Sequence, residues 1–439
     1  MPFLNPNDAA FAAGSDSQTL QNAIDEAGRG SVRTVVIPRH CSRTGKDEWV
    51  IERTLLLPDD VTIVLDDCRL RLADGVYENI FRNKNMYTDE GLTQAGEQHG
   101  IRIVGFGNAI LDGGKDNGVR EQNWQREHLP HPRTGNLILL NNVRDYSLEN
   151  FKCVNMRYWA INQIACRRGR VRKIVFDNGI HHPNQDGINF RIGCCEMQVE
   201  DISGRTGDDV VALSAFPKGG DAALLPEGRK PDIHDIVIRN VQAHTFQSVV
   251  AMRNTDGAKM YNITVENIAD VGGDMGAWGI VRIGENNYYH ERPALPGETY
   301  GITVRNIRSQ CKGTVYISAA LKDSTISDVY AGGTSLYAVS TFQPDIIFWE
   351  NGCRLSGGAA MENVLMQNIH YYGTSEYDDS DLEKYEWIAL PGAHFPGCAL
   401  DFRRMRDTDF LKNVTARDIF TREGTQKLLI RDGFSLNMQ

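Results

Sequence analysis

The sequence predicts an all-β protein, a single-domain right-handed parallel β-helix with a short helix that caps its N-terminal end. Three observations lead to this prediction. Short β-branched runs follow one another from about residue 34 onward. In these runs apolar residues flank a polar one, and an Asn or Asp closes the run. The only convincing amphipathic helical pattern comes before the first run.

The capping helix is expected over about residues 15–27. Its apolar residues recur at helical spacing and therefore share one face: Leu20, Ala23, Ile24 and Ala27. Ser15 and Gln18 have the spacing of a capping box, and Gly28 is a typical helix stop. Such a helix would cover the open end of the β-helix core.

The coils are expected over about residues 34–430. The closing Asn or Asp residues recur through the chain at 150, 178, 201, 240, 267, 306, 328, 368 and 418. Their shortest intervals, about 22–28 residues, are typical of a solenoid with one repeat per coil and loops inserted at a corner. Asn and Asp tolerate left-handed backbone and can hydrogen-bond from coil to coil, so these residues are interpreted as a structural ladder. No stretch with the composition of a linker interrupts these repeats. The sequence therefore favours a single domain that spans residues 1–439.

Composition limits the classes of function. Lys and Arg total 47 against 57 Asp and Glu, a formal charge of -10. A surface of this sign repels phosphate backbones, so no nucleic-acid partner is expected. No run of 18 apolar residues occurs, so no membrane partner is expected either. The opening MPFLNPNDAAFAAG lacks the basic and unbroken apolar regions of an export signal, and a cytoplasmic location is expected.

Cysteine usage and short motifs indicate neither a metal centre nor a cofactor. The nine cysteines lack C-x-x-C spacing, and the adjacent pair Cys194 and Cys195 is expected to stay as free thiols because vicinal disulfides are strained. No Gly-rich phosphate loop or H-E-x-x-H helix is present. We therefore expect no cofactor and no metal, and a homo-oligomer remains open because solenoids stack readily.

Three aspartates are expected to meet on one outward face of the β-helix. The segments DGINFR at 186–191 and DVVALS at 209–214 superpose, and this puts Asp186 one coil before Asp209, with Asp208 beside it. Strands in such a stack lie about 4.8 Å apart, so these like charges cannot all ionise freely and at least one pKa should rise. A protonated carboxyl beside an ionised one can supply the general acid and base of glycosidic hydrolysis, with inversion at a separation of about 6.5–9.5 Å.

Other interpretations of the same cluster stay open. Clustered Asp oxygens are also good calcium ligands. A polysaccharide lyase or uronate epimerase on the same scaffold would use a cation to neutralise the acid group of a uronate. A non-catalytic, tailspike-like carbohydrate-binding β-helix is the third possibility, because fold does not confer function.

The motifs around these aspartates resemble those of a known family. Asn184-Gln185-Asp186-Gly187, followed by Thr206-Gly207-Asp208-Asp209, is similar to the N-x-D and G-D-D motifs of glycoside hydrolase family 28, the polygalacturonase-like group. The similarity covers about residues 10–290. It implies that Asp208 is the general acid, that Asp186 and Asp209 position and deprotonate water, and that Asn184 orients the cluster.

The sequence departs from this family at two substrate-side positions. The coil after G-D-D has Ser248, preceded by Gln247, where the family supplies a His, and His244 lies four residues upstream. The next coil has Arg282 but Gly284 where the family has a Lys. Arg191 and Arg253 are expected to stack with Gly284 in one column of outward-facing positions on successive coils. A positively charged side chain could therefore still reach a neighbouring sugar-binding subsite. We therefore expect a pectin-like or related plant oligosaccharide rather than ordinary polygalacturonate.

Three further features are expected at the rim of the substrate groove beside the aspartates, and for His182 and Tyr288 two interpretations stay open. His182 would contact substrate or tune Asp186, or it would simply belong to a turn. Tyr288 would stack against a sugar ring, or it would pack on the face of the β-helix. The long loop at 113–135 would form a lid over one end of the groove.

Overall fold

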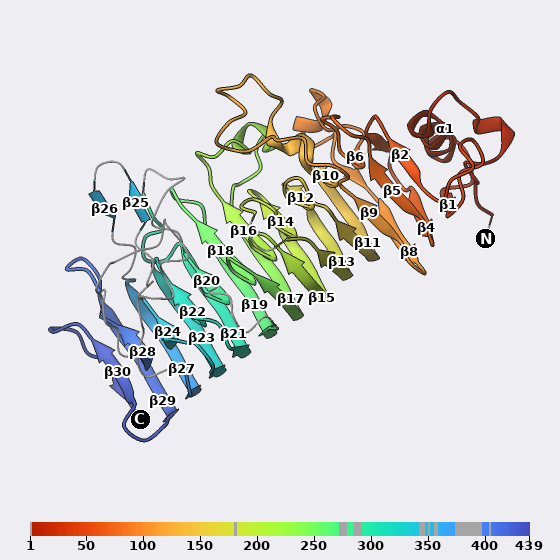
Figure 1. The fold of residues 1–439 in the computed structure, drawn as a ribbon. Coiled ribbons are helices and arrows are strands. Elements are labelled where there is room, and N and C mark those ends of the chain that lie inside the picture. The colour runs from red at the N-terminus through yellow and green to blue at the C-terminus, as the bar shows by residue number, and fades with distance from the viewer. Residues whose placement is uncertain are drawn as a thin grey trace. The chain divides into compact units, whose positions relative to one another are not determined.

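The computed structural model describes residues 2–179, 182–271, 279–284, 292–341, 347–349, 352–354, 359–373, 397–403 and 405–439. The chain divides into two compact units, Met1–Asp209 with Ala223–Lys230 and Val210–Ala222 with Pro231–Gln439. In both units nearly all regular structure is parallel β-strand, with strands of successive coils paired side by side (Figure 1). The predicted parallel β-helix is confirmed. The single-domain organisation stays a prediction.

The first unit has two parallel faces. One face contains β1 (Thr34–Pro38), β2 (Trp49–Ile51), β4 (Thr62–Asp66), β5 (Arg69–Leu72), β7 (Gln98–His99), β8 (Arg102–Phe106), β9 (Ile110–Asp112), β11 (Val143–Val154), β13 (Arg167–Asp177) and β15 (Cys195–Thr206). The other contains β3 (Leu55–Leu57), β6 (Phe81–Asn83), β10 (Ile138–Asn141), β12 (Ile161–Ile164) and β14 (Ile188–Arg191). The short 3-10 helix η1 (Ala9–Phe11) precedes these strands, and two more, η2 (Glu90–Leu92) and η3 (Pro132–Gly135), lie between them in the chain.

The second unit repeats this plan. One face contains β17 (Ile233–Thr245), β19 (Met260–Asp270), β21 (Thr299–Ser309), β23 (Leu321–Ala331), β27 (Met361–Tyr371), β29 (Leu411–Thr421) and β31 (Asn437–Met438). The other contains β16 (Val211–Ala215), β18 (Val250–Asn254), β20 (Val281–Ile283), β22 (Val315–Ile317), β24 (Tyr337–Ser340), β28 (Cys398–Phe402) and β30 (Gln426–Ile430). The antiparallel pair β25 (Ile347–Trp349) and β26 (Gly352–Arg354) and the turn η4 (Ala222–Leu224) complete the described elements.

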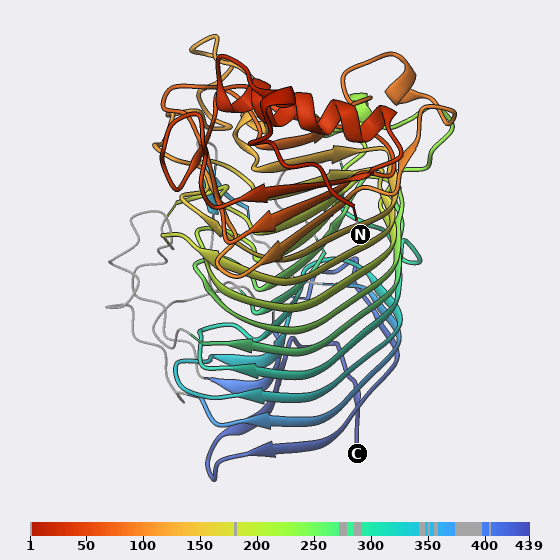
Figure 2. The same ribbon diagram turned by 90° about the vertical axis from the view of Figure 1, so that its right-hand side faces the viewer.

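The helix α1 (Asp16–Arg29) closes the N-terminal end of the first unit, as predicted (Figure 2). Ser15 is the N-cap, and its hydroxyl accepts from the Gln18 backbone N–H at 3.2 Å. The side chains of Asp16, Ser17 and Gln21 accept hydrogen bonds from backbone N–H groups at the exposed edge of β2 and β3. The helix therefore satisfies edge donors as well as covering apolar surface. It ends at Arg29, later than the stop expected at Gly28. Among the described helices none is long and apolar enough to cross a membrane.

Asn and Asp residues at the coil corners form the expected ladder. Eight of the nine predicted positions have positive φ: Asn150, Asp201, Asn240, Asn267, Asn306, Asp328, Asn368 and Asp418. In the second unit the Asn306 amide donates to Asn267 at 2.7 Å, and the Asn267 amide donates to Asn240 at 3.0 Å. The prediction for Asn178 was wrong, because strand register puts Lys173, with φ 54°, opposite Asn150.

Apolar side chains are stacked in columns inside each unit. Ile138, Ile161 and Ile188 pair in register in the first unit, and all three are fully buried. In the second unit the corresponding column is made of valines: Val211, Val250, Val281, Val315 and Val339. Each such side chain contributes about 1.5–3 kcal/mol to folding. Two strands of these columns begin directly after the aspartate motifs: β14 two residues after Asp186, and β16 two residues after Asp209.

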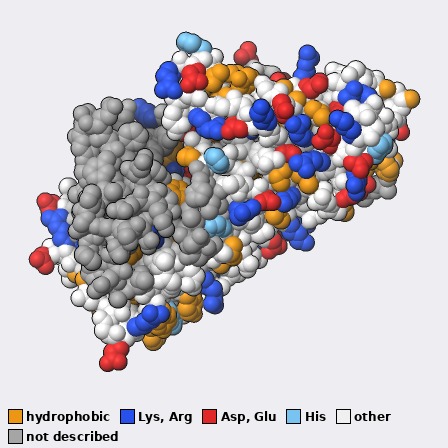
Figure 3. Space-filling model, viewed as in Figure 1, with side chains coloured by type: hydrophobic (Ala, Val, Ile, Leu, Met, Phe, Trp, Pro, Cys, Tyr) orange, Lys and Arg blue, Asp and Glu red, His pale blue; other side chains and the backbone are white. Residues whose placement is uncertain are grey.

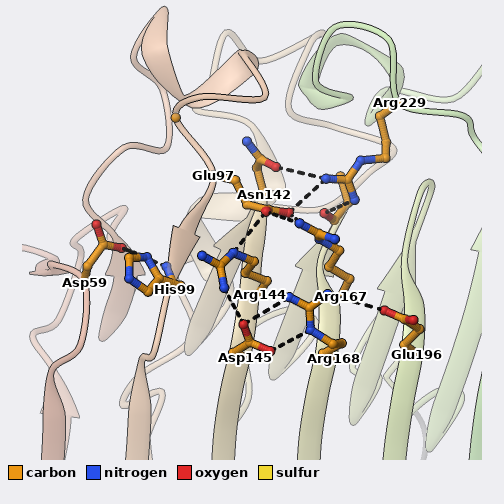
Figure 4. Close-up of polar contacts among 12 residues, drawn as sticks. Asp59, Glu97, His99, Asn142, Arg144, Asp145, Arg167, Arg168, Glu196 and Arg229 are labelled. Atoms are coloured by element: carbon orange, nitrogen blue, oxygen red, sulfur yellow. Dashed lines mark hydrogen bonds and ion pairs between the residues drawn. The ribbon is translucent and has the colours of Figure 1, made fainter.

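Charged side chains of both signs are mixed on the face of the first unit seen in Figure 3. Glu97 is the centre of an ion-pair network in this unit (Figure 4). Only 8% of its side chain is exposed, and it contacts Arg144 at 3.3 Å, Arg167 at 2.7 Å and Arg229 at 2.9 Å. Burial alone would raise the pKa of Glu97, but hydrogen bonds from Arg167 and Arg229 hold it below its usual value. Arg229 belongs to the segment Ala223–Lys230, so the network fixes that segment to the first unit.

We predict that Glu97→Gln lowers the free energy of unfolding at neutral pH by about 2 kcal/mol, between the values for exposed and buried pairs. Because the folded protein lowers the pKa of Glu97, this stabilisation is complete above the unfolded pKa near 4.5. It is lost as the pH falls through the lower folded pKa. Urea denaturation at neutral and acidic pH measures the effect. Asp47→Asn, in an exposed pair with Arg39, is the control and should change stability much less than Glu97→Gln does. An effect of Glu97→Gln that persists unchanged at low pH would contradict the role of its charge.

Candidate active site

The first unit brings the three motif aspartates together. Asp186 precedes β14 by two residues, and Asp208 and Asp209 follow β15. One carboxylate oxygen from each lies within 4.8 Å of the other two. Asp186 and Asp209 are buried, and Asp208 is half-buried. The convergence expected from the coil superposition is therefore present in the structure, while the catalytic roles stay a prediction.

Backbone contacts orient the carboxylate of Asp208. The N–H of Asn184 donates to its Oδ2 at 2.7 Å, and the N–H of Asp209 donates to its Oδ1 at 2.9 Å. Asn184 can present its N–H this way because it adopts φ 62°, a conformation that Asn tolerates better than most residues. Two backbone donors stabilise a negative charge on Asp208.

Steric crowding explains why the first residue of the G-D-D motif, Gly207, is a glycine. A Cβ at Gly207 would lie 2.3 Å from the carbonyl oxygen of His182, so only glycine fits where the two motif segments cross. The carbonyl of Asp209 in turn accepts from the Gly187 N–H at 2.9 Å. These backbone contacts explain why both motifs are needed to build one cluster.

The remaining site residues of the first unit flank the cluster along the chain. Asn184 is half-buried, and its Oδ1 has no hydrogen-bond partner among the described residues. His182 is exposed, as expected of a rim residue. Arg191, at the end of β14, is buried, and its guanidinium lies 4.5 Å from the ring centroid of Trp159. Arg191 is thus held against an aromatic face by a cation–π contact.

The other predicted substrate-binding residues belong to the second unit. Gln247 is half-buried and its backbone N–H donates to the Thr245 hydroxyl at 3.2 Å. Arg253, at β18, donates to the Ser214 hydroxyl at 3.3 Å, and Arg282, in β20, is buried. Their reach toward the carboxylates stays a prediction. Tyr288 lies outside the described residues.

Two side-chain pairs in the structure were not predicted from the sequence, although His244 itself was singled out there. Tyr158 is buried, and its hydroxyl donates to Glu121, which belongs to the loop at 113–135. Burial, followed by the charge of Glu121, raises the pKa of Tyr158 well above 10. In the second unit the Nδ1 of His244 lies 3.6 Å from Asp270. The first pair could have been suspected because Tyr158 lies one coil before Asp186, next to Trp159.

The cluster has the dimensions of a cation site. Calcium binds carboxylate oxygens at about 2.3–2.6 Å, so two ligands of one ion are at most about 4.6–5.2 Å apart. The 4.8 Å span of the three aspartate oxygens falls within this limit. Asp186, Asp208 and Asp209 could therefore hold one hard cation.

No family model matches the chain, and no curated protein matches its sequence. Solved structures do match. A hyperthermoactive exopolygalacturonase from Thermotoga maritima aligns with TM-score 0.56 and 14% identity, over 100% of this chain and 90% of that one. The A-module of a mannuronan C-5 epimerase from Azotobacter vinelandii aligns with TM-score 0.59 and 13% identity, over 99% and 100%. The catalytic domain of a GH87 alpha-1,3-glucanase, in complex with nigerose, aligns with TM-score 0.55 and 13% identity, over 97% and 66%. At these identities the similarity shows the parallel β-helix fold alone.

Gly284 cannot carry the missing lysine. It follows Ile283, which pairs with Met252, so Gly284 lies beside Arg253 as expected. Its φ is 96°, and a Cβ there would lie 2.5 Å from the Cβ of Ala319. The position therefore excludes any side chain, not only lysine.

We predict that Gly284→Ala destabilises the protein by about 3 kcal/mol, from left-handed backbone together with overpacking. Gly297→Ala is the matched control, because Gly297 has φ 88° but nothing within 4 Å of the added Cβ. It should cost only about 1–2 kcal/mol. Urea denaturation of both variants measures the difference, and equal losses would contradict the steric argument.

Proposed function

We propose that the protein is a carbohydrate-active enzyme, a glycoside hydrolase that cleaves a glycosidic bond in a pectin-like or related plant oligosaccharide. The observation that carries this proposal is the convergence of Asp186, Asp208 and Asp209 within 4.8 Å. Glycosidic hydrolysis needs one carboxylic acid to protonate the leaving oxygen and one carboxylate to act on the water or the sugar. Crowded carboxylates share protons unequally and can supply both states. Two of the similar solved structures are an exopolygalacturonase and a GH87 alpha-1,3-glucanase, which agrees with this proposal.

The proposed roles follow the family resemblance, with Asp208 as general acid and Asp186 and Asp209 acting on water. The backbone N–H groups at Asp208 favour its ionised form. Protonation of Asp208 must therefore be favoured by the two neighbouring carboxylates, because their negative charges repel a third one. In this proposal the acid role belongs to Asp208 only as a member of the three-carboxylate cluster. Asn184, His182 and Arg191 are the proposed substrate contacts of the first unit, and Gln247, Arg253, Arg282 and Tyr288 those of the second.

The stereochemical outcome is a separate question. Inverting enzymes usually hold their carboxyl groups about 6.5–9.5 Å apart, and retaining enzymes about 5–5.5 Å apart. The oxygens of this cluster are closer than the inverting range. Inversion stays a prediction that the spacing does not support by itself, and the anomeric configuration of the first product decides it.

The proposal predicts turnover of at least one member of a panel of purified uronate, rhamnose-containing and neutral oligosaccharides. NMR of the first product reports both the cleaved bond and its anomeric configuration. Asp208→Asn should lower kcat by about 10²–10⁴-fold, the usual contribution of a general acid. Asp201→Asn is the control, because Asp201 is an exposed corner residue with φ 57° that Asn accepts. Its kcat should stay unchanged.

Two results would count against hydrolysis at this cluster. Glycan binding that is equal in the parent and Asp208→Asn, with turnover in neither, would favour a non-catalytic carbohydrate-binding β-helix. Turnover that survives Asp208→Asn unchanged would move the reaction away from this cluster.

A cation-assisted lyase or uronate epimerase is the second candidate, favoured by the span of the three oxygens, which fits one calcium ion. We predict that the hydrolase keeps its activity in chelator and forms no ultraviolet-absorbing unsaturated product. Loss of activity in chelator, recovery on adding calcium and a new ultraviolet absorbance would favour the lyase. Recovery without such absorbance, but with a changed uronate configuration by NMR, would favour the epimerase. The cytoplasmic location, the lack of nucleic-acid and membrane partners, and a homo-oligomer stay predictions.

A further inference from the structure

Asn189 contacts one member of the carboxylate cluster, Asp186. It belongs to β14, three residues after Asp186, and its side chain is fully buried. Its Nδ2 donates to Asp186 Oδ2 at 3.1 Å. An ionised carboxylate only accepts, so this contact fixes which end of the amide faces Asp186. Because its side chain is fully buried, Asn189 would affect a bound sugar through its contact with Asp186 and not by touching the sugar.

The column that contains Asn189 does not require an amide for packing. Leu139, Asn162 and Asn189 occupy the same register position in three successive strands, and all three are fully buried. Leu139 shows that an apolar side chain fits this column. Asn162 donates to Asn136 at 3.1 Å rather than to a carboxylate.

The amide of Asn189 also lowers the stability of the fold. Its Oδ1 is buried and has no hydrogen-bond partner among the described residues. Burying a polar atom without a partner destabilises a fold, and a leucine at this position would avoid that. The contact with Asp186 is the feature that sets Asn189 apart from the leucine two strands earlier.

We propose that Asn189 is a positioning residue that holds the Asp186 carboxylate turned toward Asp208 and Asp209. This inference rests on the hydrolase function proposed above. Asn189 fixes one oxygen of Asp186 and so restricts rotation of the carboxylate. A misplaced carboxylate slows the chemical step while leaving the sugar contacts in place, since small errors of geometry cost far more in rate than in binding.

The test compares Asn189→Leu with the matched control Asn162→Leu, using the full chain and an oligosaccharide that the parent cleaves. Asn189→Leu should lower kcat by about tenfold or more with KM within about twofold. Asn162→Leu should leave kcat and KM within about twofold of the parent, because it removes a buried amide without touching Asp186. Equal loss of kcat in both variants, or unchanged kcat in Asn189→Leu, would overturn the inference.

A thermal double-mutant cycle tests the contact without activity. In the Asp186→Ala background, Asn189→Leu should shift Tm differently than in the parent, whereas Asn162→Leu should shift it equally in both. Additive shifts for Asn189 and Asp186 would overturn the inference. If Asp208→Asn abolishes turnover but Asn189→Leu does not affect it, the hydrolase proposal stands and only the positioning role fails. If the parent cleaves no glycan, the hydrolase proposal and this role fail together, and the cycle reports the contact alone.

Discussion

Lateral pairing of parallel strands is the interaction on which the rest of this structure depends. Because one coil pairs with the next in register, a residue in one strand lies about 4.8 Å from the residue at the same position of the neighbouring strand. This spacing stacks isoleucines and valines into columns inside the units and turns corner Asn residues into a ladder. It also brings Asp186 close to Asp208 and Asp209, which lie more than twenty residues further along the chain.

Much of this arrangement could be predicted from the sequence because the repeat carries it. The ladder positions follow from Asn and Asp at the ends of β-branched runs, and the capping helix follows from the spacing of Leu20 and Ile24. Asn178 was misassigned because an Asn happens to follow β13, while the true corner position of that coil is Lys173. Lysine carries no compositional signal for left-handed backbone, so pairing alone identifies it.

The aspartate cluster could be expected from the same superposition, but its surroundings could not. The N–H groups that hold Asp208, and the Tyr158 contact to Glu121, depend on loop conformations that no periodicity encodes. Asn189 sits on an outward position of its strand, which a simple alternation rule assigns to solvent, yet it is fully buried. Gly284 could be recognised as a departure from the family motif, whereas the closeness of Ala319 that excludes a side chain is visible only in three dimensions.

The polar side chains of α1 have a consequence for how the protein behaves in a crowded solution. Asp16, Ser17 and Gln21 occupy backbone donors that an incoming strand would otherwise use. A foreign strand can add to that edge only by first displacing a helix that is tied down at three points. The first coil is thereby protected from strand-by-strand accretion of other chains, which is the hazard that any unclosed stack of parallel strands carries.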